Sequence, residues 1–311
     1  MSNVLTGVTS SRTVAVNRQV SKIKEMLIER LLQLCSLLSV FITGAIVVIL
    51  FSESIGFFEH VSLFNFLTDT KWTPLFTEKH YGILPLLSGT LLTTFIAVIT
   101  AVPLGLVSAI YLSEYASARA RKIIKPILEI LAAVPTVVYG YFALLFVTPL
   151  LRKFIPGLSG FNALSAGMVM GVMIIPLVSS LSEDAMHSVP MGLREGAYAL
   201  GSYKIQVAFK IIFPAALSGI TAAVILAVSR AIGETMIVAI AAGQQPTLTF
   251  NPLVSVETIT AYIVQVSLGD TPQGTLEYKT IFVCGLMLFV LTLFLNVISF
   301  KLKRRFQNVY D

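Results

Sequence analysis

The chain has 311 residues, of which 56% are hydrophobic and only 12% charged. Soluble domains have about 45–50% apolar and about 25% charged residues, so this composition excludes an ordinary soluble enzyme and indicates an integral membrane protein. The net charge of +6 would suit nucleic-acid binding, but the basic residues gather at the ends of apolar runs, which argues against a nucleic-acid partner.

Six apolar runs are long enough to cross a lipid bilayer, whose hydrocarbon core of about 30 Å requires about 20 helical residues. The sequence therefore predicts an all-α membrane protein. The six predicted spans are Leu31–Phe51, Leu84–Leu112, Ile123–Leu150, Ala163–Leu181, Ala215–Ala242 and Thr280–Phe300. Pro103, Pro126 and Pro135 supply kink points in the two longest runs, and Gly167 and Gly171 permit close helix packing in the fourth.

Lys and Arg are distributed unequally between the two sides of the predicted spans. If the N-terminus is cytoplasmic, sixteen of the 22 basic residues lie inside, five lie outside and Arg230 lies within a span. Cytoplasmic segments of membrane proteins carry the excess of positive charge, so both termini are predicted to be cytoplasmic. The inner residues at the two termini are Arg12, Arg18, Lys22, Lys24, Arg30, Lys301, Lys303, Arg304 and Arg305.

The predicted outer segment 52–83 is rich in aromatic residues. They are Phe57, Phe58, Phe64, Phe66, Trp72 and Phe76. Aromatic side chains commonly form a belt at the membrane interface, which is the simpler interpretation, and a docking surface for an extracytoplasmic partner is the alternative.

The cytoplasmic loop 182–214 is the only inner connection long enough to hold structure of its own. Ser188 can cap a short helix, with Pro190 in its first turn. Gly201 is suited to end that helix in a left-handed conformation. We therefore expect a helix of about ten residues outside the membrane.

The spacing in this loop resembles the EAA loop of ABC importer permeases, which reads Glu-Ala-Ala, three residues, Gly, nine residues and Ile-x-Leu-Pro. The matching positions are Glu195, Gly196, Ala197, Gly201, Ile211, Phe213 and Pro214. The resemblance implies that the helix docks into a separate ATPase, and small residues at positions 196 and 197 would allow close approach. A helix resting on lipid headgroups is the alternative. The chain contains no phosphate-binding G-x-x-x-x-G-K-[ST] loop, so the ATP would be used by the partner, and this chain would bind no cofactor.

The fifth predicted span contains an ionisable pair, Arg230 and Glu234, followed by Thr235. At 1.5 Å per residue from Ala215, Arg230 lies about 22 Å along the helix, slightly past the membrane midplane. Charged residues inside spans cost about 2.5–3.5 kcal/mol each, which favours a function in the transport path over a helix-fastening pair. An Arg fork suits oxyanions, and we expect Glu234 to hold Arg230 when the path is empty.

Other ionisable residues give weaker signals. Glu114 and Glu129 are expected at the membrane interface. The three His residues have no metal-ligand spacing, and no nucleophile and base are paired as intramembrane catalysis would require.

Further stretches are similar to the PstC-type permease family of phosphate importers. They are Arg230–Met236, Tyr111–Tyr115, Pro135–Gly140 and Gln265–Asp270. The resemblance implies a type I ABC importer fold in a bacterial inner membrane. It also implies a complex with a PstA-type permease, two PstB-type ATPase subunits and a PstS-type phosphate-binding protein.

The predicted organisation is an N-terminal segment 1–30, a first span and outer loop 31–83, a permease core 84–300 and a basic tail 301–311. Molybdate and sulfate importers share the EAA loop, so another oxyanion remains an alternative cargo. A secondary transporter is a further alternative, although it would normally have internal repeats and discontinuous helices near the midplane.

Overall fold

The computed structural model describes residues 5–307, with side chains for residues 24–301, and its secondary structure is helical apart from one isolated bridge between Trp72 and Tyr81. The chain divides into two units, residues 1–52 and 53–311. The first unit belongs to helix α1 (Leu5–Phe58), whose apolar side chains are exposed, as a lipid-facing span requires. Six basic residues expected near the termini lie outside residues 24–301, where side chains are described: Arg12, Arg18, Lys22, Lys303, Arg304 and Arg305.

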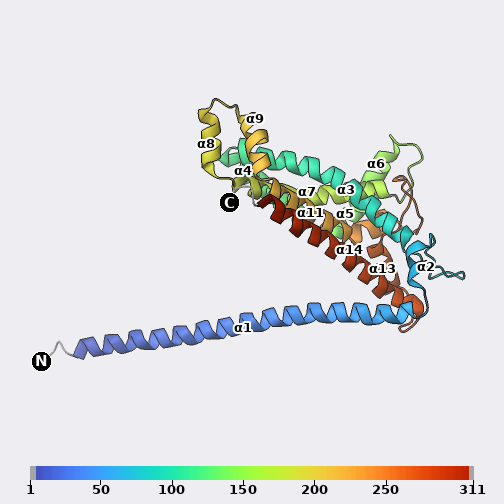
Figure 1. The fold of residues 1–311 in the computed structure, drawn as a ribbon, viewed down its shortest axis with the longest axis horizontal. Coiled ribbons are helices and arrows are strands. Elements are labelled where there is room, and N and C mark those ends of the chain that lie inside the picture. The colour runs from blue at the N-terminus through green and yellow to red at the C-terminus, as the bar shows by residue number, and fades with distance from the viewer. Residues whose placement is uncertain (1–4, 308–311) are drawn as a thin grey trace. The chain divides into compact units, whose positions relative to one another are not determined.

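The second unit contains the remaining helices (Figure 1). In chain order they are α2 (Leu63–Thr68), α3 (Leu84–Ile110), α4 (Ala118–Ala133), α5 (Thr136–Phe142), α6 (Thr148–Arg152), α7 (Ala163–His187), α8 (Met191–Ala199), α9 (Lys204–Val207), α10 (Phe213–Ala215), α11 (Leu217–Ile232), α12 (Met236–Ala241), α13 (Ile259–Leu268) and α14 (Leu276–Gln307). Three π-helical turns join them, η1 (Tyr111–Tyr115), η2 (Ala143–Val147) and η3 (Ala208–Ile212).

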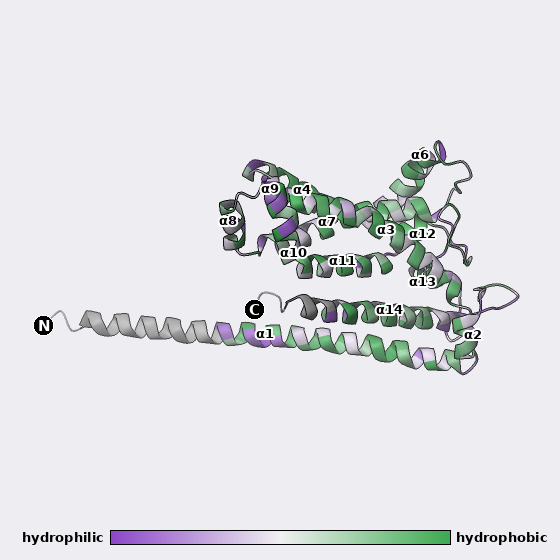
Figure 2. Ribbon diagram, turned by 45° about the horizontal axis from the view of Figure 1, so that its top comes forward, coloured by the Kyte–Doolittle hydropathy of each residue, from purple (hydrophilic) through white to green (hydrophobic). Residues whose placement is uncertain are grey.

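Four described helices are long and apolar enough to cross a membrane, and two bent helix pairs bring the number to six if each pair is one span. The four are α1, α3, α7 and α14. The number agrees with the six predicted spans. The second bent pair joins Lys204–Ala215 to Leu217–Ile232 at 71°, so it starts and ends earlier in the chain than the predicted fifth span Ala215–Ala242. Neither the third nor the fifth predicted span is a continuous helix. Hydrophobic residues run along α11 and α14, and hydrophilic residues concentrate near α9 (Figure 2).

The third span is broken at Val134 and Pro135, where the two halves meet at 88°. Val134 has the extended backbone (ψ 130°) that a following proline favours. Pro135 then stands immediately before α5. The proline that the sequence offered as a kink point therefore divides this span into two helices.

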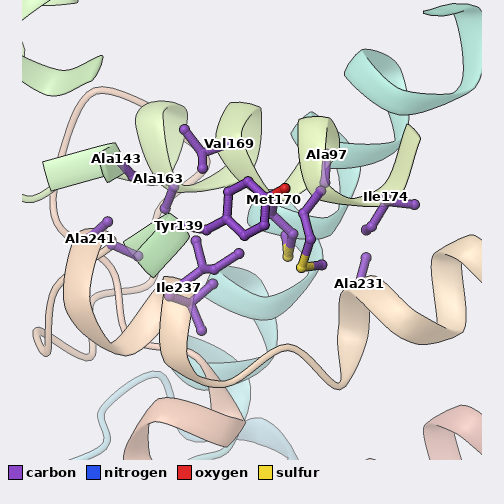
Figure 3. Packing of buried hydrophobic residues seen from close by; sticks show 14 of the residues in the cluster. Ala97, Tyr139, Ala143, Ala163, Val169, Met170, Ile174, Ala231, Ile237 and Ala241 are labelled. Carbon is purple, nitrogen blue, oxygen red and sulfur yellow. The ribbon is translucent and has the colours of Figure 1, made fainter. Parts of the chain in front are cut away.

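The main core lies where α3, α5, α7, α11 and α12 converge, and Figure 3 shows Tyr139 beside Met170 and Ile237. The close packing of α3 against α7 depends on glycine. A Cβ atom on Gly171 would lie 2.6 Å from Thr100 Cβ, nearer than carbon atoms can approach. The Gly167–Gly171 pair therefore brings these two helices together, as predicted.

The aromatic residues of the outer segment do not form a simple interfacial belt. Phe57, Phe66 and Trp72 are buried in a second core, where the Trp72 ring meets Tyr262 of α13 edge to face at 5.0 Å. Phe64 and Phe76 remain exposed. The simpler sequence-based interpretation was wrong for the buried residues because α13, about 190 positions later in the sequence, covers them.

Candidate functional site

The fifth span is interrupted at the positions that carry its charges. Helix α11 ends at Ile232, and α12 begins at Met236 after a short break. The break is supported by Thr260 of α13, whose hydroxyl donates a 2.6 Å hydrogen bond to the Glu234 carbonyl oxygen. A helix can be interrupted inside a membrane only where protein satisfies the freed backbone groups, as Thr260 does here.

Arg230 and Glu234 form an ion pair across this break, with 2.8 Å between Arg230 Nη1 and Glu234 Oε2. The Glu234 side chain is 2% exposed, and its second oxygen accepts a hydrogen bond from the Ile237 backbone N–H. The Arg230 side chain is 44% exposed, and its Nη2 atom lies 3.9 Å from Met173 Sδ. The Thr235 hydroxyl donates to the nearby Gly233 carbonyl oxygen. The carboxylate is thus a fixed anchor, whereas the guanidinium keeps free surface.

A cavity of about 440 Å³ lies beside Arg230, between α4 and α7. One face of each helix lines it, with positions 125, 128, 129 and 132 from α4 and positions 173, 174, 176, 177, 180 and 183 from α7. The spacing of three and four residues is that of a single helical face. Glu129, expected at the interface, is therefore a cavity residue.

The same cavity contains a second ion pair, which the sequence did not indicate. Lys125 Nζ lies 2.6 Å from Glu183 Oε2, and Arg121 Nε lies 3.9 Å from the other carboxylate oxygen. Glu183 is buried near the end of α7. In the sequence it stands beside other polar residues, so the sequence assigns it to the loop 182–214 and not to a site. The contact between α4 and Glu183 is visible only in the folded structure.

A short helix is present where the loop predicted one: α8, nine residues long, lies at the end of the second unit opposite α6 and α13 (Figure 1). Gly201 follows it with φ of +80°, the left-handed conformation expected there. Ser188 does not cap this helix. It follows α7, its hydroxyl donates to the Ala185 carbonyl oxygen, and Pro190 occupies the capping position of α8.

The two small residues of α8 differ in exposure. Gly196 is exposed with open space around its Cα atom, as is the neighbouring Glu195, whereas Ala197 is 6% exposed and packs in a cluster with Met186 and Val207. The expectation that both small residues face a partner was therefore wrong for Ala197. Ile211 packs against the same cluster, and Pro214 lies exposed within α10. Large apolar side chains remain exposed nearby, namely Met191, Leu200, Tyr203 and Ile205.

Helix α8 is fastened to the bundle by Arg194. Its Nη2 atom lies 3.3 Å from Glu114 Oε1 in η1 and donates to the Met186 carbonyl oxygen at 2.8 Å. Its Nη1 atom donates to the Val189 carbonyl oxygen. Both charged side chains are nearly buried, at 12% and 7% exposed. Glu114 is thus a structural link between α3 and α8, and not the simple interfacial residue that we expected.

Comparison with known proteins decides the family. Residues 101–308 match the family described as binding-protein-dependent transport system inner membrane component. The chain belongs to this family. It is 34% identical over 292 residues to the probable ABC transporter permease protein YqgH of Bacillus subtilis, with 93% of each chain covered. It is also 34% identical over 275 residues to the phosphate transport system permease protein PstC of Haemophilus influenzae, covering 81% of this chain and 85% of the relative.

Solved structures of importers share the fold. A bacterial ABC transporter that imports alginate aligns with 88% of this chain and 96% of its own, with a TM-score of 0.56 at 17% identity. A structure of the methionine ABC transporter MetNI aligns with 72% of this chain and 94% of its own, with a TM-score of 0.53 at 18% identity. Secondary transporters also contain broken helices, but the family is one of binding-protein-dependent transport, which removes that alternative.

Proposed function

We propose that this chain is a permease subunit of an ATP-driven phosphate importer and forms half of the translocation path. Curated relatives named as phosphate permeases, over most of the chain, support this cargo. The observation that carries the proposal is the exposed guanidinium of Arg230, anchored on buried Glu234 and open to a cavity. Arg suits this role because its planar fork binds tetrahedral oxyanions through parallel hydrogen bonds.

In this proposal, phosphate binds the guanidinium donors of Arg230 that Glu234 does not use. Glu234 holds the side chain in place between transport events, and Thr235 lies beside it at the start of α12. Because the fifth span is broken here, backbone movement at positions 233–235 can move Glu234 relative to Arg230 without unwinding α11. Interrupted helices also form substrate sites in other transporters, where the helix ends and freed backbone groups face the substrate.

The second part of the proposal concerns energy coupling at α8. The excess of Lys and Arg in the predicted inner segments supports a cytoplasmic position for α8 and for both termini. Glu195 and Gly196 are exposed for contact with a separate ATPase, and the apolar residues beside them supply a docking surface. Ala197, Gly201, Ile211 and Pro214 hold the helix and its following segment in place.

The partners follow from this role. The complex contains a PstA-type permease as the other half of the path, two PstB-type ATPase subunits that use ATP, and a PstS-type protein that delivers phosphate from outside. This chain itself binds no nucleotide and no cofactor.

Uptake of phosphate into vesicles containing the full complex tests the proposal. The double variant Arg230→Gln with Glu234→Gln leaves no buried carboxylate unpaired, so the complex should still assemble. We expect it to lower uptake about tenfold to a hundredfold, because phosphate loses its hydrogen bonds to a charged group. Glu195→Ala should instead weaken binding of the ATPase. Lys122→Gln, an exposed change on α4 outside the cavity, is the control. Uptake of sulfate or molybdate in place of phosphate by the unaltered complex would contradict the cargo.

A further inference from the structure

The cavity beside Arg230 has a second cation at its other end, built in the same way. Arg230 is 44% exposed on a carboxylate that is 2% exposed, and Lys125 is 39% exposed on a carboxylate that is 3% exposed. In each pair a buried Glu fixes the position of a cation that keeps surface in the cavity. Arg230, Lys125 and Glu183 all line this one cavity.

The two cations lie apart along α7. Arg230 contacts Met173, and Lys125 contacts Glu183. These two α7 residues are ten positions apart on one cavity-lining face, which is about 15 Å of helix at 1.5 Å per residue. The two cations are therefore held at different positions along the cavity wall.

We propose that Lys125 is a second binding position for a tetrahedral oxyanion, which receives the anion after it leaves Arg230 and before it leaves the protein. The proposal rests on the proposed import function and adds a site to it. Lys125 lies nearer the α8 end of α7 than Arg230 does, so the order follows the direction of import. Its ammonium group is a compact charge with three donors, suited to brief capture of an oxyanion.

The carboxylates explain why the anion does not remain bound. An ion path requires binding that is favourable enough for entry and weak enough for exit, usually through several sites. Glu183 offsets the positive charge of Lys125, as Glu234 offsets that of Arg230, so each cation holds an oxyanion less tightly. Glu129, one helical turn from Lys125 on the same face, adds negative charge that favours release.

Uptake by vesicles containing the full complex tests this position. Removing Lys125 alone would leave Glu183 buried without its closest partner, which destabilises proteins strongly. The double variant Lys125→Gln with Glu183→Gln removes both charges together and avoids that effect. Lys125→Arg keeps the cation, and Lys122→Gln is the matched control on the same helix, exposed and outside the cavity.

Uptake is measured per assembled complex for phosphate, sulfate and molybdate side by side. The anion that the unaltered complex carries tests the proposed cargo, and the ratio of variant to unaltered uptake for that anion tests Lys125. We expect about a tenfold loss in the double variant, as for one hydrogen bond to a charged group, and retention of most uptake in Lys125→Arg and Lys122→Gln. Unchanged uptake in the double variant, or equal loss in Lys125→Arg, would overturn the proposal.

Discussion

The link between Arg194 and Glu114 gives the most quantitative expectation for energy coupling. At 3.3 Å the two charges attract by about 5 kcal/mol for an effective dielectric constant of about 20, before desolvation is subtracted. Removing one member of a buried pair typically costs about 3–5 kcal/mol, so we expect Glu114→Ala to lower the free energy of unfolding by about 3 kcal/mol. Arg194→Ala should cost about 1–3 kcal/mol more, because it also frees the carbonyl oxygens of Met186 and Val189.

A double-mutant cycle isolates the pair itself. Unfolding of the chain in detergent micelles, for both single variants and the double variant, should give a coupling energy of about 1–3 kcal/mol. The exposed pair Lys79–Glu277, with Lys79 51% exposed, is the control and should give less than about 1 kcal/mol. Additive effects at positions 114 and 194 would refute the link. If it holds, either single variant should also lower phosphate uptake per ATP hydrolysed, since α8 loses its connection to α3.

Three further changes have expected outcomes in the same unfolding assay. Gly171→Ala should cost about 1–3 kcal/mol because its Cβ atom would lie 2.6 Å from Thr100 Cβ, whereas Gly196→Ala, with open space around it, should be harmless. Gly201→Ala should cost about 1 kcal/mol because φ there is +80°. Burial raises the pKa of Glu257, in the connection 243–258, from 4.5 to about 8, so the folded state keeps a proton that the unfolded state loses. Stability should therefore fall as pH rises through that window, by up to about 5 kcal/mol, and Glu257→Gln should abolish this dependence.

The spans and α8 could be predicted because their signals are local. Hydrophobic length reports directly on membrane crossing, and a glycine at position 201 can end a helix whatever surrounds it. The ionisable pair at 230 and 234 was also visible, since charge inside an apolar run is costly wherever it occurs.

The rest depended on contacts between distant parts of the chain. The break after Ile232 interrupts an apolar run that reads as one helix, and it is supported by Thr260, 26 positions after Glu234. The argument that Arg230 and Glu234 share one helix therefore failed, although their pairing was right. Glu183 similarly gains its meaning from Lys125, nearly sixty positions earlier. Patterns in a single sequence do not predict contacts between residues so far apart in the chain.

The buried outer cluster gives the protein a spectroscopic reporter of its own. Trp72 is the single tryptophan of the chain, and its ring is 1% exposed against Tyr262 of α13. Tryptophan emission shifts to longer wavelength when water reaches the indole, so fluorescence will register any opening between the outer segment and α13. That helix also carries Thr260, which supports the break beside Arg230. The fluorescence of Trp72 can thus report rearrangement of the transport path without an added label.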